Sequence, residues 1–246
     1  MIKKIFIVIF AVSVCFCFMH CKGKTYGNVT TIKYDSIDED DSEENKDLVK
    51  LIKPYDDALN SEMEQVIGTS DLSMSKARPE GLLSNFVADL VFNETAKLDG
   101  FKADFCLLNH GGLRAPLPKG DIKVKNIYEL MPFENEVVIV EIEGHKVKEI
   151  ASYLNYTGGE PVSGIKLNLS TNPEILIQNK AVDVNRTYKI ITSDYLAKGG
   201  DKMYFFSEPI SLVKTGIKLR DMIMNHVKEL TKSGKTLKAN LDGRIS

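Results

Sequence analysis

The residues with the clearest chemical potential lie in one short stretch, LNHGGLR, at residues 108–114, straight after a hydrophobic segment. Gly111 and Gly112 allow a sharp turn and a close approach of the backbone to a ligand, because neither carries a Cβ. Asn109 offers an amide for hydrogen bonding, and Arg114 offers a guanidinium suited to phosphate or hydroxyl groups. The pattern predicts a polar cleft, and an ordinary turn with a surface arginine is the alternative.

Two further segments place aromatic, amide and acidic side chains beside turns. They are MPFEN at 131–135, with Phe133 and Asn135, and SDYLAKGGD at 193–201, with Tyr195 and Asp201. Taken alone, a proline–phenylalanine pair at a strand edge is core packing in most proteins. These segments therefore indicate a ligand site only when they are combined with the turn at 108–114.

Hydrophobic patterns predict the elements that position these residues. Short, continuously apolar runs ended by polar residues are typical of buried strands, and alternation around a turn is typical of a hairpin. The strands predicted in this way lie at 103–109, 137–143 and 187–196, and the hairpin joins 164–169 to 174–179. Helical spacing predicts helices at 48–67, interrupted by Pro54, from Pro79 onward, at 144–154 and around 219–230. Strands and helices interleave without a repeating unit, so we expect a mixed α/β (α+β) fold.

Read together, three segments carry a family resemblance. LNHGGLRAPLPKGDI, YELMPFENEVVIVEIEGHKV and SDYLAKGGDKMYFF occur in this order and at near-family spacing, and they resemble the C-terminal domain of the bacterial and animal 5′-nucleotidases. The resemblance extends from about Ile67 to Ile245 and includes a closing DGRI. It implies a layered α/β/β/α architecture, with a ligand cleft where the loops beside the buried strands converge.

The resemblance also implies roles for single residues. Phe133 and Tyr195 match the two aromatic residues that hold the nucleoside base between them, a stacking worth about 1–3 kcal/mol per ring by analogy with single-strand binders. The family commonly has phenylalanine where Tyr195 stands, and tyrosine keeps the stacking face. Asp201 matches the acid that accepts hydrogen bonds from the ribose hydroxyls. The other matches, to residues that contact base, ribose or phosphate, are Asn109, Arg114, Asn135 and, on the phosphate-facing side, Arg78.

Full-length members of this family have a second domain that holds two metal ions. Its signatures, DxH, GDxxxD and GNHE, supply the clustered ligands of such a site, and none occurs in this sequence. The four histidines, at positions 20, 110, 145 and 226, include no pair at ligand spacing. We therefore expect no metal cofactor in this chain and two divalent metals in a separately encoded metallophosphoesterase partner.

These observations leave three functional hypotheses. In the first, the chain is the nucleotide-recognition half of a split 5′-nucleotidase-type hydrolase. In the second, it is a surface lipoprotein that binds nucleosides or nucleotides without catalysis. In the third, it is a hydrolase that acts alone through an unrecognised site.

The N-terminal residues predict export. An apolar run at 5–19 behind Lys3 and Lys4 has the length of a secretory h-region. Cys21, which follows, resembles the acylated cysteine of a bacterial lipoprotein, so we expect a membrane-anchored protein of the cell envelope. An ordinary cleaved signal and an uncleaved anchor are the alternatives.

The predicted organisation is a leader at 1–21, an acidic tether at 22–47 and a nucleotide-binding domain at 48–246. Residues 35–47 hold eight carboxylates and one lysine, which favours a solvated, disordered tether, with calcium binding as an alternative. Residues 48–246 carry a formal net charge of zero, so no nucleic-acid-binding surface is indicated.

Overall fold

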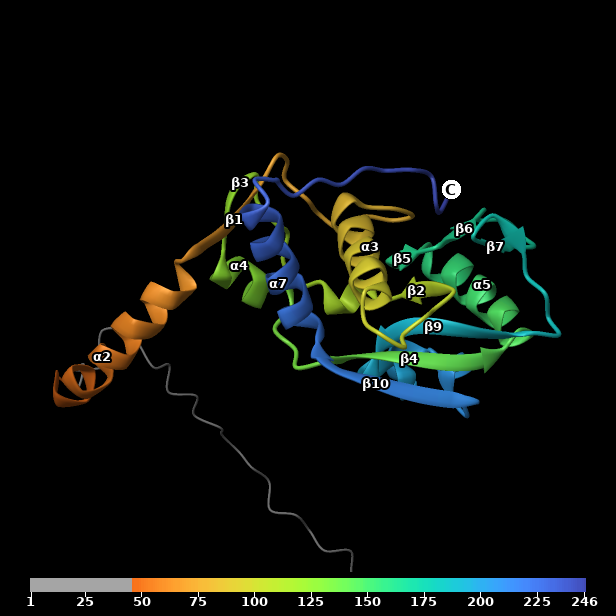
Figure 1. The fold of residues 1–246 in the computed structure, drawn as a ribbon, viewed down its shortest axis with the longest axis horizontal. Coiled ribbons are helices and arrows are strands. Elements are labelled where there is room, and N and C mark those ends of the chain that lie inside the picture. The colour runs from red at the N-terminus through yellow and green to blue at the C-terminus, as the bar shows by residue number, and fades with distance from the viewer. Residues whose placement is uncertain (1–45) are drawn as a thin grey trace, which may run out of the picture. The chain divides into compact units, whose positions relative to one another are not determined.

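The computed structural model describes residues 46–246 (Figure 1). The predicted leader, the predicted lipidation site Cys21 and nearly all of the predicted acidic tether lie outside the described residues. By its internal contacts the chain divides into Met1–Val49 and Lys50–Ser246, and the fold described below is that of the second unit.

Helices and strands are interspersed along the described chain, with five strands in succession between α5 and α6. The helices are α2 (Lys46–Met63), α3 (Leu82–Ala96), α4 (Val124–Leu130), α5 (Lys146–Thr157), α6 (Asp194–Ala197) and α7 (Leu219–Lys232). The strands are β1 (Val66–Ser70), β2 (Phe105–Leu107), β3 (Gly120–Lys123), β4 (Glu136–Glu143), β5 (Val162–Ser163), β6 (Ile165–Leu167), β7 (Ile175–Ile177), β8 (Lys180–Ala181), β9 (Thr187–Ser193) and β10 (Ser211–Lys218).

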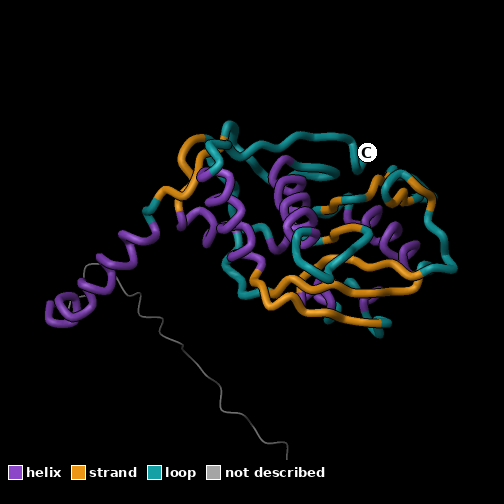
Figure 2. Tube along the Cα trace, viewed as in Figure 1, coloured by secondary structure: helices purple, strands orange, loops and turns teal. Residues whose placement is uncertain are grey.

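A five-stranded sheet organises the domain, with strand order β10-β4-β9-β2-β5. The β4, β9 and β10 strands run side by side in Figure 2, and each pairs antiparallel with its neighbour. β2 pairs parallel to β9, and the short β5 closes the far edge antiparallel to β2. Two smaller sheets, β1-β3 and β6-β7-β8, complete the set in the described residues.

The inner strands of the five-stranded sheet are buried on both faces, and successive side chains of each strand point to opposite faces. On β4, Val137 and Ile139 belong to a core shared with α3 and α7, while Val138 and Val140 belong to a second core shared with α5. On β2, Cys106 belongs to the first core, and its neighbours Phe105 and Leu107 belong to the second. This two-sided burial explains why the two strands read as continuous apolar runs.

The helices pack through stripes of apolar residues at helical spacing. On α5 the buried residues are Val147, Ile150, Ala151 and Leu154. The helix ends at Gly158, whose φ of 73° is the left-handed conformation that glycine adopts without strain, and the amide of Gly159 donates to the Leu154 carbonyl at 2.8 Å. This cap directs the chain back toward the sheet and starts the loop that reaches Glu160.

The C-terminal segment is tied to the domain near its end. Figure 1 shows this segment passing over α3 and ending near β6, and a bridge joins Ile245 to Leu167 of β6. The Arg244 guanidinium donates to both carboxylate oxygens of Asp89 on α3, at 2.6 and 2.8 Å, and to the Val162 carbonyl. The DGRI sequence therefore fastens the end of the chain to α3 and β5.

The mixed α/β class expected from the sequence is confirmed, and the predicted buried strands and the hairpin β6-β7 are present. Several details differ. α2 runs through Pro54 and ends at Met63. Residues 194–196, predicted as the end of a strand, belong to the short helix α6, where the Ser193 hydroxyl accepts from the Leu196 amide as an N-cap. The sequence reading did not find β10, since this edge strand is partly exposed and lacks a continuous apolar run.

No helix among the described residues combines the length and the apolar composition that a membrane span requires.

Candidate functional site

Three loops meet at one edge of the five-stranded sheet because of the strand directions. β2 runs parallel to β9, so the carboxyl ends of these strands lie at the same edge. β4 runs antiparallel to β9, with Val137 opposite Ser193, so the amino end of β4 lies there as well. The loops after β2 and β9 and the segment before β4 are the three segments that the sequence singled out. The topology therefore brings their side chains together.

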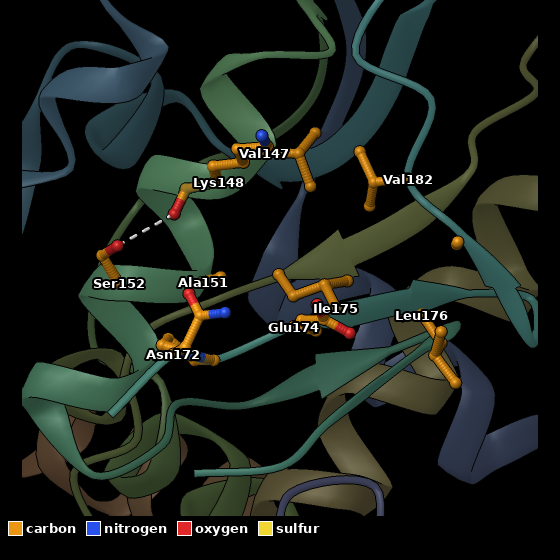
Figure 3. Close-up of a pocket in the computed structure, with 11 residues that line it drawn as sticks. Val147, Lys148, Ala151, Ser152, Asn172, Glu174, Ile175, Leu176 and Val182 are labelled. Carbon is orange, nitrogen blue, oxygen red and sulfur yellow. Dashed lines mark hydrogen bonds between the residues drawn. The ribbon is translucent and has the colours of Figure 1, made fainter. Parts of the chain in front are cut away.

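A hollow of about 450 Å³ lies elsewhere in the domain, between α5 and the β7-β8 hairpin (Figure 3), and a second hollow of about 310 Å³ lies at the loop edge of the main sheet. Eight of the nine predicted binding residues line the second hollow. They are Asn109, Gly111, Gly112, Arg114, Phe133, Asn135, Tyr195 and Asp201. The ninth, Arg78, lies outside its lining. Residues from three distant parts of the sequence thus surround one cavity of the size of a small-molecule site.

The larger hollow lacks such convergence. Figure 3 shows the Ser152 hydroxyl pointing along α5, and it donates to the Lys148 carbonyl of its own helix at 3.1 Å. Val147, Ile175 and Val182 supply an apolar floor. We therefore take the hollow at the loop edge as the candidate site.

The turn after β2 is built around the Asn109 side chain. Asn109 is buried, and its Nδ2 donates to Oδ2 of Asp201 at 2.6 Å. A Cβ placed on Gly112 would come within 2.9 Å of Oδ1 of Asn109, and one on Gly111 within 3.2 Å of Oδ2 of Asp201. A side chain at Gly112 would therefore push against the Asn109 amide, and one at Gly111 would crowd the Asp201 carboxylate.

Lys76 also stabilises this turn, by hydrogen bonds to its backbone carbonyls. Its Nζ donates to the carbonyls of His110 and Leu113, at 2.8 and 2.7 Å. The backbone amide of Arg114 then donates to the Leu130 carbonyl at 2.9 Å, which fixes where the arginine leaves the turn. The sequence reading missed Lys76, because a lone lysine in an extended segment carries no signal of this role.

The GGD turn after β9 holds Asp201 in the left-handed region, with φ of 51°. Oδ1 of Asp201 accepts a hydrogen bond from the Tyr195 hydroxyl at 2.9 Å, while Oδ2 accepts from Asn109. A Cβ on Gly200 would lie 2.5 Å from the Tyr195 ring, so the absence of a side chain there lets the ring lie against the turn. The hydrogen bond to Asp201 raises the pKa of the Tyr195 phenol above its ordinary value.

Four side chains leave recognition groups available in the hollow. Phe133 and Tyr195 are 41% and 44% exposed, which is high for large aromatic rings, and no ring contact in the described chain joins them. Among the described residues, the guanidinium of Arg114 and the side-chain amide of Asn135 have no hydrogen-bond or ion-pair partner. The arrangement offers two aromatic faces, one cation and one amide to a ligand.

Arg78 is committed to a neighbouring loop. Its Nη2 donates to Oε1 of Glu160 at 2.8 Å, and its Nε donates to the Gly159 carbonyl at 3.0 Å. The other oxygen of Glu160 accepts from the His110 backbone amide at 2.6 Å. Burial raises the pKa of Glu160, although both of these hydrogen bonds oppose the rise. Arg78 thus contacts the candidate site through Glu160 and the turn.

His110 begins the HGG turn as a buried side chain whose Nε2 has no partner within the described structure. Burial lowers the pKa of the imidazole to about 4, and the nearby cations Arg78 and Lys76 lower it further in the same direction. The ring is therefore neutral at pH 7. His110 therefore acts in the turn as an uncharged, buried side chain.

The segment that carries Phe133 and Asn135 is held by residues that the sequence reading did not single out. Glu134 pairs with Arg220 of α7, and the guanidinium of Arg220 also lies 4.4 Å from the centre of the Tyr128 ring. Because Arg220 lies 86 positions after Glu134 in the chain, no local pattern could reveal the contact. Across the described residues, no three His, Cys, Asp or Glu side chains are grouped as a metal ion would require.

A family model for the C-terminal domain of 5′-nucleotidases matches residues 65–208. The chain belongs to this family. The match covers all three loops of the candidate site, and it confirms the family resemblance seen in the sequence.

Curated relatives of this 5′-nucleotidase C-terminal domain include the trifunctional nucleotide phosphoesterase protein YfkN of Bacillus subtilis, 25% identical over 91% of this chain and 16% of that protein. Protein UshA of Escherichia coli is 27% identical over 70% of this chain and 32% of its own length. The structure resembles that of a 5′-nucleotidase precursor from Thermus thermophilus, with a TM-score of 0.67 and 25% identity over 80% of this chain and 42% of that one. The chain thus spans less than half the length of each of these proteins.

The fold extends to relatives with lower sequence identity. The NAD nucleotidase of Haemophilus influenzae has a TM-score of 0.61 at 19% identity, over 80% of this chain and 40% of that chain.

Proposed function

We propose that this chain is the nucleotide-recognition component of a 5′-nucleotidase-type hydrolase and that it acts with a separately encoded metallophosphoesterase chain. The base stacks between Phe133 and Tyr195, Asp201 accepts from the ribose, and Arg114 faces the phosphate. Membership of the 5′-nucleotidase C-terminal domain family supports a nucleotide ligand. The division of labour between two chains and the role of each residue are our proposal.

One observation carries this proposal. Eight residues from three segments far apart in the sequence line one hollow, and the groups that remain unpaired there are suited to a nucleotide. Aromatic faces bind any base by stacking, and a guanidinium binds phosphate with two parallel hydrogen bonds. A surface turn with a stray arginine would not gather two exposed rings around the same cavity.

The chain's own contribution to hydrolysis is orientation. Stacking between Phe133 and Tyr195 fixes the base, and the contact to Asp201 fixes the sugar, so the phosphate is presented in a defined direction. Orientation of this kind contributes several kcal/mol to lowering a barrier, up to about 7–11 kcal/mol in well-aligned systems. The two divalent metals expected in the partner chain would supply an activated water and charge stabilisation.

Isothermal titration calorimetry of the purified protein with AMP and adenosine tests the recognition half of the proposal. We expect binding of both ligands, and affinities about 5- to 150-fold weaker for Phe133→Ala, which corresponds to the loss of one stacked ring at about 1–3 kcal/mol. Tyr156→Ala is the matched control, because Tyr156 is an aromatic residue on α5 that is 85% exposed and outside the hollow. Equal losses in the two variants would remove the stacking assignment.

Phosphate release from AMP tests the catalytic half. With added manganese or zinc, the purified chain alone should not turn over AMP, and addition of an exported chain with DxH, GDxxxD and GNHE motifs should give turnover. Steady turnover by this chain alone would overturn the split-enzyme proposal.

The second candidate is a nucleoside- or nucleotide-binding protein without catalysis. It would need only the groups that line the hollow, namely two exposed aromatic rings, a guanidinium and an amide, and no second chain. Tight binding by this chain, with no turnover in the presence of any metallophosphoesterase chain from the same cell, would favour this candidate over the first.

We also propose that the protein is exported and anchored to the bacterial cell envelope through a lipid on Cys21. Mass spectrometry of the mature N-terminus tests this. A diacylglyceryl-modified Cys21 is expected, and a Cys21→Ala protein should appear in the soluble envelope fraction. An unmodified N-terminus at another residue would overturn the proposal.

A further inference from the structure

The Tyr195 hydroxyl is bound to the same residue that the proposed function assigns to the sugar. It donates to Oδ1 of Asp201 at 2.9 Å and accepts from the Asp201 backbone amide at 3.3 Å. Tyr195 is 44% exposed, so water could have satisfied the hydroxyl. Both partners of the phenol instead come from Asp201.

The carboxylate of Asp201 is therefore partly occupied before any ligand arrives. Oδ1 accepts from Tyr195 and Oδ2 accepts from Nδ2 of Asn109 at 2.6 Å. An ionised carboxylate has about four acceptor positions, so internal donors use roughly half of them. The two neighbouring hydroxyls of a ribose would have to share the positions that are left.

The surrounding backbone keeps the phenol in this place. A Cβ on Gly200 would stand 2.5 Å from two atoms of the Tyr195 ring, so the ring lies close over the glycine. Asp201 itself has φ of 51°, in the left-handed region, and its carboxylate reaches the Tyr195 hydroxyl. On the other side, a Cβ on Gly111 would lie 3.2 Å from Oδ2. The carboxylate is thus enclosed by the turn on one side and by the phenol on the other.

Phenylalanine, the residue that the family resemblance leads us to expect in place of Tyr195, has the same stacking face without the hydroxyl. The hydroxyl is therefore the part of Tyr195 that base stacking does not need. In the ligand-free protein, its hydrogen bond to Asp201 raises the pKa of the phenol.

We propose that the Tyr195 hydroxyl is a specificity-determining group that competes with ligand hydroxyls for Asp201. This inference rests on the proposed function, since it concerns the sugar of a bound nucleoside. With one carboxylate oxygen held by the phenol, the second ribose hydroxyl gains little, and the site binds nucleosides and 2′-deoxynucleosides with similar affinity.

The test compares wild type, Tyr195→Phe and Tyr156→Phe in calorimetric titrations with adenosine and 2′-deoxyadenosine. The ratio of the two dissociation constants is the readout. We expect a ratio within about threefold for wild type and for Tyr156→Phe, where the same hydroxyl is removed outside the hollow. For Tyr195→Phe we expect the ratio to rise to about tenfold or more, through tighter adenosine binding, because Oδ1 becomes free for a ligand donor.

Two results would overturn the inference while leaving the proposed function intact. One is an unchanged ratio in Tyr195→Phe, and the other is weaker adenosine binding in that variant, which would mean that the phenol assists Asp201. If neither ligand binds to any of the three proteins, the proposed function fails and the specificity role fails with it.

A ligand-free measurement tests the contact itself. Ultraviolet difference titration of wild type against Tyr195→Phe reports the phenol of Tyr195 alone, and its midpoint should lie above that of an ordinary tyrosine. The midpoint should fall in Asp201→Asn, because the neutral amide no longer disfavours the phenolate. An ordinary midpoint in wild type would show that the contact is absent in solution and would overturn the inference.

Discussion

Glu160 joins two parts of the chain through its two carboxylate oxygens: Oε2 accepts from the His110 backbone amide at 2.6 Å, and Oε1 accepts from Nη2 of Arg78 at 2.8 Å. Glu160 is 5% exposed, so these contacts are made largely out of water. The HGG turn, and with it the position of Asn109 and Arg114, depends on a buried carboxylate that is not itself in the lining of the hollow.

Glu160→Leu should lower the free energy of unfolding by about 2 kcal/mol, because the buried His110 amide and the Arg78 guanidinium lose their acceptor. Glu160→Gln should cost less, about 1 kcal/mol, because one amide oxygen can still accept. Urea denaturation measures both values. Glu149→Gln is the control, since Glu149 is an exposed residue of α5. A similar loss of stability in the control would contradict a stabilising role for the Glu160 contacts.

His110 should make the protein less stable in acid. Its pKa is about 4 in the folded state against 6.5 for the free side chain, so the unfolded chain takes up the proton first. The contribution of the neutral imidazole to the free energy of unfolding is fully present above pH 6.5. It falls by about 2 kcal/mol, after allowance for partial solvation, as the pH drops toward 4. Urea midpoints of wild type and His110→Gln at several pH values should therefore converge on acidification.

Protonation of Glu160 changes the free energy of unfolding in the opposite direction to protonation of His110. Its folded pKa lies above 4.5, so the folded state binds the proton first and stability from this group rises as the pH falls toward 4.5. Comparison of His110→Gln in the wild-type and Glu160→Gln backgrounds separates the two titrations. A difference between wild type and His110→Gln that stays constant from pH 7 to pH 4 would contradict a neutral, buried imidazole.

Arg114→Gln should separate phosphate recognition from base recognition. The guanidinium has no protein partner in the described structure, so its removal leaves no buried group unpaired. We expect AMP to bind about tenfold or more weakly, as for the loss of a charge-assisted pair, and adenosine to bind within about twofold of wild type. Calorimetry with both ligands makes adenosine the internal control. An equal loss for both ligands would place Arg114 at the base or the sugar.

Arg244→Met should destabilise the domain through the loss of its contacts to Asp89 and Asp242. Arg244 is buried and the two carboxylates are partly exposed, so we expect about 2–3 kcal/mol, below the cost of breaking a fully buried pair. Urea denaturation gives the value. Lys53→Met is the control, because its pair with Asp57 is exposed on α2 and should contribute less than about 0.5 kcal/mol.

The sequence by itself determined the mixed α/β class and the principal buried strands. β2 and β4 are covered on both faces, so their apolar runs are continuous and can be read without a structure. The edge strand β10 was not found, because partial exposure leaves it with a mixed pattern. The chemistry of the three loop segments could be predicted only from their combination, because the glycine pair and Arg114, Phe133 and Asn135, and Tyr195 and Asp201 stand in separate segments that occur in the family order.

Only the tertiary structure decided which groups are free. The Tyr195 ring could be assigned a stacking role from its type, but its hydrogen bond to Asp201 depends on how the GGD turn folds back. The family resemblance matches Arg78 to the phosphate-facing side, and only the structure reveals that its guanidinium also donates to Glu160, 82 positions further along the chain. Hydrogen bonds between residues so distant depend on strand order and loop closure, and no local pattern of side chains encodes them.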